Sequence, residues 1–127
     1  MLIRAMVVDG DKLPVVRPHK NYLGLVTSGS HPDVVPDESG EVSPGDGGLS
    51  GVTTHPNDLP AFRRPRQFGG SSPGVAFVID DASKLTTRLT IRPDTPPHAM
   101  IEPASRMSVS DFEQEIANTR TLWRIWP

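Results

Sequence analysis

The chain has 127 residues, enough for a buried core, and we expect a single domain over residues 1–127. Its 13 Lys and Arg against 15 Asp and Glu give a formal net charge of -2, which carries no strong nucleic-acid signal and does not indicate a membrane-surface protein. The absence of cysteine excludes disulfides, thiolate metal sites and a cysteine nucleophile, and no segment is apolar enough to span a bilayer.

Fourteen prolines and eleven glycines predict a loop-rich fold with short strands. The first predicted strand is residues 2–8, an apolar run that contains Arg4 and ends at Asp9-Gly10. Arg4 has two interpretations: an edge position with its guanidinium in water, or a side chain that reaches into a cleft to grip a phosphate or carboxylate. Residues 27–45 are dense in Gly, Pro, Ser and acidic residues, which predicts a mobile loop.

The middle of the chain contributes one candidate binding turn and one clear strand. Gly47 and Gly48 allow a tight turn and a close approach of the backbone to a bound group, and they place Ser50 at the edge of a strand continuing through residues 52–54. The same pattern also fits ordinary turn chemistry. Residues 75–79 are apolar on both faces, so we expect a strand in the middle of a sheet.

The last third of the chain predicts two strands and a helix. Residues 85–91 alternate moderately, and residues 97–104 hold apolar positions between prolines, with His98 at the entrance of that strand. The segment from residue 108 to residue 126 has helical spacing, and its run from Ser110 to Glu113 matches a capping box. The pattern as a whole predicts an α+β fold.

The sequence shows no metal site, because its four histidines lie far apart and lack zinc spacing. Ser50 lacks the nucleophile elbow of a serine hydrolase. The three arginines between residues 63 and 66 are explained by a solvated surface. Composition and spacing alone therefore assign no reaction.

Four short motifs follow one another along the chain in an order that is itself informative. The order of Leu2-Ile3-Arg4-Ala5, Gly47-Gly48-Leu49-Ser50-Gly51-Val52, Phe77-Val78-Ile79 and His98-Ala99-Met100-Ile101-Glu102-Pro103-Ala104, followed by a Trp-bearing terminal segment, resembles a bacterial toxin family. That family comprises a cytostatic effector exported by type VI secretion and its relatives in toxin–antitoxin pairs. Their fold is similar to NAD-dependent ADP-ribosyltransferase toxins. The resemblance implies a compact fold with short, mostly antiparallel strands around a cleft and a C-terminal helix.

The resemblance also implies a site and a setting. Catalytic residues would be Arg4, Ser50 and His98, and NAD, as substrate, would be bound by Arg4, Ser50, Tyr22, Gly48 and Leu49. The implied activity is transfer of ADP-ribose to a cellular target, or NAD hydrolysis, causing growth arrest. The toxin would act in the cytoplasm of the producing cell or of a recipient cell. A cognate antitoxin or immunity protein would cover the cleft.

The chain departs from the family at Leu49, where a family member has threonine, and it has His98 where many ADP-ribosyltransferases have a catalytic glutamate. Glu102 is an even number of residues further on, so it would share a face with His98 at a distance of roughly 13 Å. Two alternatives therefore stay open. One is an RNA 2′-phosphotransferase-like enzyme of the same architecture, and the other is a non-enzymatic module that docks a partner through Trp123 and Trp126.

Overall fold

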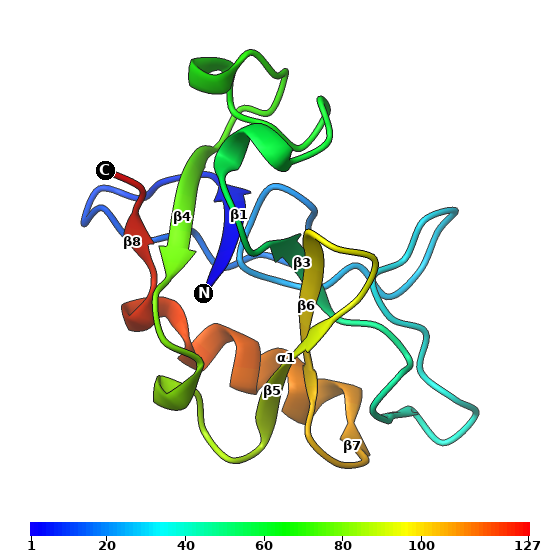
Figure 1. Cartoon of the computed structure of the whole chain (residues 1–127). Helices are drawn as coiled ribbons and strands as arrows, with labels where there is room; N and C mark the ends of the chain where they lie inside the picture. Colours follow the sequence, from blue (N-terminus) through cyan, green and yellow to red (C-terminus); the bar gives the residue numbers. More distant parts are fainter.

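The computed structural model describes residues 1–127 and contains one six-stranded sheet with the order β5-β6-β3-β1-β4-β8 (Figure 1). Every pair of neighbouring strands in this sheet is antiparallel. The strands are β1 (Leu2–Met6), β3 (Leu49–Val52), β4 (Val75–Ile79), β5 (Leu89–Pro93), β6 (His98–Pro103) and β8 (Arg124–Ile125). A separate pair is formed by β2 (Glu41–Val42) and β7 (Met107–Ser108), and one α-helix, α1 (Val109–Asn118), follows near the C-terminus. The α+β class with mostly antiparallel strands and a C-terminal helix is confirmed.

The two faces of the sheet are covered by different parts of the chain. Because side chains alternate along a strand, one face carries Leu2 and Phe77 and packs against α1 through Phe112. The other face carries Ile3 and Val78 and packs against the segment between β3 and β4 and the chain end. Both faces are buried, which explains why residues 75–79 are apolar at every position. The predicted strand at these residues is confirmed.

The helix begins before the position that the predicted capping box at Ser110 gives, and it ends sooner than the helical spacing up to residue 126 predicts. The side-chain oxygen of Ser108 accepts a hydrogen bond from the backbone N–H of Asp111 at 3.0 Å, so Ser108 is the N-cap. Ser110 lies inside α1, and the capping-box prediction at Ser110 is wrong. The helix ends at Asn118, because a short 3-10 turn, Arg120–Leu122, leads the chain back to the edge of the sheet as β8.

Neither tryptophan belongs to this helix. Trp123 is only 1% exposed and lies in the main core, and its indole N–H donates to the hydroxyl oxygen of Thr119 at 3.0 Å. Trp126 packs partly buried against the second face of the sheet, with its ring 5.5 Å from that of His55. The expectation that a partner docks on both tryptophans is therefore wrong for Trp123, because its side chain is buried in the folded chain.

Three strand boundaries differ from the sequence prediction. The first strand ends at Met6 rather than at residue 8, because the chain turns back to make an isolated bridge between Val8 and Pro14. The strand expected at residues 52–54 lies at Leu49–Val52, where it pairs with β6. The strand expected from residue 85 begins at Leu89, after a short 3-10 turn, Ala82–Lys84.

The segment of residues 27–45 is mostly turns, as expected, but it is anchored at two points. Val34 and Val42 are buried in the main core, and Val42 pairs with Met107 through β2 and β7. Two valines that are widely spaced along the segment thus tie it to the region of α1.

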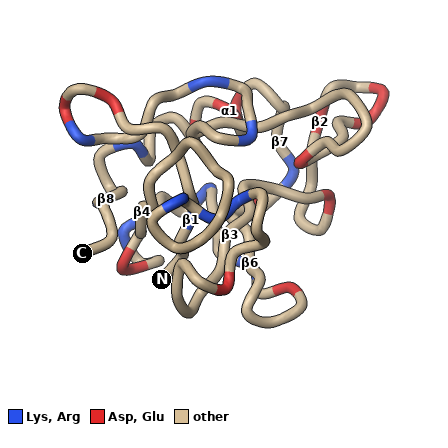
Figure 2. The backbone as a smooth tube through the Cα atoms, turned by 90° about the horizontal axis from the view of Figure 1, so that it is seen from above, with Lys and Arg blue, Asp and Glu red and all other residues tan.

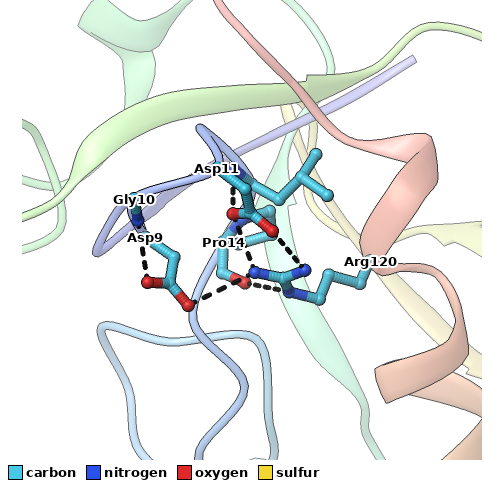
Figure 3. Close-up of polar contacts among 6 residues, drawn as sticks. Asp9, Gly10, Asp11, Pro14 and Arg120 are labelled. Carbon is cyan, nitrogen blue, oxygen red and sulfur yellow. Dashed lines mark hydrogen bonds and ion pairs between the residues drawn. The ribbon is translucent and has the colours of Figure 1, made fainter.

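A cluster of polar contacts fastens the chain turn after β1 to the 3-10 turn that follows α1 (Figure 3). The guanidinium of Arg120 donates two hydrogen bonds to Asp11 at 2.8 and 2.9 Å, one to Asp9 at 3.3 Å and one to the backbone oxygen of Pro14 at 2.9 Å. The Arg120 guanidinium holds the pKa of Asp11 below its usual value. Figure 3 thus shows how residues more than 100 positions apart hold the two ends of the chain together.

None of the helices has the length and apolar character needed to cross a membrane.

Candidate functional site

The site begins where two neighbouring strands separate. β1 pairs with β4 along its whole length but with β3 only at Ile3 and Val52. Beyond that pair the side chain of Arg4 joins the strands, because its Nη1 donates to the backbone oxygen of Ser50 at 3.1 Å. The sheet is therefore open at Arg4, and a guanidinium occupies the place of ladder hydrogen bonds.

Arg4 is a buried residue of an interior strand, so the interpretation as an edge arginine in water is wrong. Its side chain is 2% exposed, and its Nη2 donates to the backbone oxygens of Lys20 and Tyr22 at 2.8 and 3.1 Å. Burial, and to a lesser extent the nearby charge of Arg63, lowers the pKa of Arg4 to about 10, against the opposing effect of Asp33. Arg4 still carries its charge at neutral pH.

A cavity of about 130 Å³ lies at the opening between β1 and β3. Its roof comes from the segment of residues 59–63, and it contains no carboxylate. The residues that line it are Arg4, Ala5, Ser50, Gly51, Val52, Leu59, Pro60, Phe62, Arg63 and His98. The fold therefore brings the three proposed catalytic residues, Arg4, Ser50 and His98, to a single cavity from three different strands.

Ser50 and His98 share one face of the sheet. Ser50 is paired with Met100 and Val52 with His98, so the two side chains lie diagonally across β3 and β6. The hydroxyl of Ser50 makes no hydrogen bond within the chain and is free for a ligand.

His98 has a carboxylate partner that the sequence did not single out. Its Nδ1 lies 3.2 Å from Oδ2 of Asp94, across the tight turn that leads into β6. An ionised carboxylate only accepts hydrogen bonds, so the Nδ1 proton points to Asp94 and Nε2 of neutral His98 is an acceptor. In the sequence, the only signal for this pair is the four-residue spacing between Asp94 and His98. That spacing predicts a contact only when the turn between the two residues is known.

Three of the proposed NAD-binding residues do not line the cavity. Tyr22 gives only its backbone oxygen to Arg4, while its ring packs against His19 and under the guanidinium of Arg17. Leu49 is fully buried on the α1 face. Gly48 lies against β6, where a Cβ atom would meet the backbone oxygen of Ile101 at 2.0 Å, so its small size serves strand packing.

Glu102 lies outside this cavity as well. Its carboxylate accepts a hydrogen bond from the backbone N–H of Gly45 at 2.8 Å and is 3.6 Å from Arg92. These residues line a separate hollow of about 280 Å³. Glu102 is thus engaged in holding the loop before β3 and does not take the place of a catalytic glutamate.

Arg63 lines the cavity, although the sequence pattern of residues 63–66 predicted a solvated surface position for it. Its side chain makes no ion pair and no hydrogen bond, its Nε is buried without a partner, and its guanidinium lies 5.6 Å from the ring centre of Phe62. Five other arginines, all later in the chain, pair with carboxylates: Arg88, Arg92, Arg106, Arg120 and Arg124. Figure 2 shows basic positions around β1 and β3 in the middle of the view, whereas most acidic positions lie on outer loops.

No family model, no curated protein and no solved structure matches the chain. Function is therefore inferred from the cavity itself. Its features are two guanidiniums, a free hydroxyl and an imidazole held by a carboxylate. Guanidiniums are chemically suited to bind an oxyanion, and a neutral imidazole is suited to accept a proton.

Proposed function

We propose that the chain is a bacterial toxin with an ADP-ribosyltransferase-like fold that binds NAD in this cavity and transfers ADP-ribose to a cellular target or to water. The observation that supports the proposal is the meeting of Arg4, Ser50 and His98 at one cavity from three strands. These are the residues that the resemblance implies.

Each side chain has a chemical role in this proposal. Arg4 attracts a phosphate of NAD, and the Ser50 hydroxyl binds on the nicotinamide side. The bond between nicotinamide and C1 of its ribose breaks, its electron pair leaves with nicotinamide, and the nucleophile forms a new bond to C1. Nε2 of His98 hydrogen-bonds the ribose hydroxyls or takes the proton that the nucleophile loses.

The size of the cavity limits which part of NAD it encloses. At about 130 Å³ it is smaller than the roughly 300–1,000 Å³ of typical ligand pockets. One end of the dinucleotide therefore enters the opening between β1 and β3, and the remainder lies on the surface outside. In the proposed setting the enzyme works in the cytoplasm, and a cognate antitoxin or immunity protein silences it by covering this opening.

The test is to measure nicotinamide release from NAD and the transfer of labelled ADP-ribose to cell extract. We expect His98→Ala and Ser50→Ala to lose both signals. His31→Ala is the matched control, because His31 is exposed and lies outside the cavity. Absence of nicotinamide release, together with growth arrest that persists in His98→Ala, would reject the proposal.

A second candidate function is favoured by the absence of a carboxylate from the cavity lining. An RNA 2′-phosphotransferase-like enzyme uses arginine and histidine and does not need the glutamate of ADP-ribosyltransferases. The two candidates are separated by incubating the chain with NAD and with 2′-phosphorylated RNA. Loss of the RNA phosphate would support this second function, and consumption of NAD without the RNA would support the first.

A further inference from the structure

The roof of the cavity is also the wall of a second hollow. Phe62 and Arg63 line both the cavity and a neighbouring space of about 410 Å³, which we call the outer hollow. The outer hollow also contains Lys20 and His19, and like the cavity it contains no carboxylate. Two hollows with cationic side chains and no acidic one thus lie on either side of Arg63.

Arg63 has hydrogen-bonding capacity that the chain does not use. Its Nε and the Nε of Arg4 are buried polar atoms without a partner. A buried N–H without an acceptor is unfavourable, and such groups in native structures call for an explanation. Both arginines line the cavity, so a small shift of either side chain on ligand binding would bring an unused N–H to an acceptor from outside the chain.

The two guanidiniums also repel each other. The charge of Arg63 contributes to the lowered pKa of Arg4, and burial strengthens such interactions. An oxyanion in the cavity would attract both cations and offer acceptors to their unused N–H groups.

We propose that Arg63 is a second oxyanion ligand of the cavity, and that the two hollows together bind a diphosphate, with one phosphate at Arg4 and Arg63 and the other beside Lys20. The ligand class is an organic diphosphate. This inference deepens the proposed function, since NAD contains such a group, but it depends only on the two linked phosphates and not on any cleavage of the ligand.

The test is calorimetric titration of the whole chain with inorganic pyrophosphate, ADP-ribose and inorganic phosphate. We expect Arg63→Ala to weaken pyrophosphate and ADP-ribose binding by about 10–100-fold, the loss typical of one charged hydrogen-bond donor. Lys20→Ala should weaken pyrophosphate binding more than phosphate binding. Arg66→Ala is the matched control, because it removes the same charge from an exposed position outside both hollows, and we expect less than about threefold weakening.

Equal weakening by Arg63→Ala and Arg66→Ala would overturn the inference, as would the absence of diphosphate binding to the unaltered chain. A melting curve of each variant shows whether it is folded, and Arg63→Lys provides a second, milder substitution. Arg63-dependent diphosphate binding without NAD cleavage would support the inference and reject the proposed enzyme. Cleavage of NAD with an unchanged KM in Arg63→Ala would support the enzyme and overturn the inference.

Discussion

Arg4 supports the fold as well as the candidate site, and replacing it with methionine tests this directly. The substitution removes three hydrogen bonds from a charged donor to backbone oxygens. At roughly 1.5–3 kcal/mol for each such bond, the loss is about 4.5–9 kcal/mol. The cost of burying the charge offsets part of it: a fall in pKa from 12.5 to about 10 corresponds to roughly 3 kcal/mol. The net loss of stability is about 1.5–6 kcal/mol.

Thermal unfolding followed by circular dichroism measures this loss. For a chain of this length, about 1 kcal/mol corresponds to roughly 4 °C in Tm, so we expect Arg4→Met to melt at least about 4 °C lower. His98→Ala is the comparison, since its side chain is 38% exposed and bonds only to Asp94, and its stability should change by less than about 0.5 kcal/mol. A Tm of Arg4→Met within about 1 °C of the unaltered chain would refute the expectation that these bonds outweigh the burial cost.

Three further predictions concern the C-terminal segment and the contacts that hold it. Ser108→Ala should lower stability by about 0.5–2 kcal/mol in urea unfolding and Ser110→Ala by clearly less, because only Ser108 caps α1; equal losses would contradict the assigned cap. Thr119→Val should lower the free energy of unfolding by about 1–3 kcal/mol, because it leaves the buried indole N–H of Trp123 without an acceptor. A double-mutant cycle tests this reason, since the loss should be smaller in a Trp123→Phe background. Arg120→Ala should lower Tm at pH 7. The difference should diminish in melts below about pH 3.8, because the folded-state pKa of Asp11 lies below that value and the contribution of this pair is lost as the carboxylate is protonated; a difference as large at pH 2 as at pH 7 would contradict this.

The proposed diphosphate binding and the contribution of Arg4 to the stability of the fold are connected. A ligand that binds only the folded state raises Tm with its concentration, so pyrophosphate should stabilise the unaltered chain. In the proposed diphosphate site Arg4 contributes its unused N–H groups, while three of its four Nη–H groups are committed to backbone oxygens. Loss of activity in an Arg4 variant is therefore informative only when its folding has been measured.

The local pattern of the sequence predicted several elements correctly because burial dictates their composition. Residues 75–79 are buried on both faces of the sheet, which requires apolar residues at every position. Prolines and apolar residues around His98 predicted β6 within a residue at each end. The helix was found from its apolar spacing, but its start was misplaced, since two serines two positions apart offer the same capping chemistry and only the pairing of β7 with β2 selects Ser108.

The sequence alone determined that the chain alternates short strands with turns, and its resemblance to a toxin family singled out Arg4, Ser50 and His98 as candidates for one site. Tertiary structure decided that these three meet, because the incomplete pairing of β1 with β3 opens a cavity beside Arg4. It also assigned Asp94 and Arg63 to the site and left Leu49 and Glu102 outside it. The physical reason is that strand register and loop packing fix which side chains are neighbours, and both depend on contacts between residues far apart in the chain.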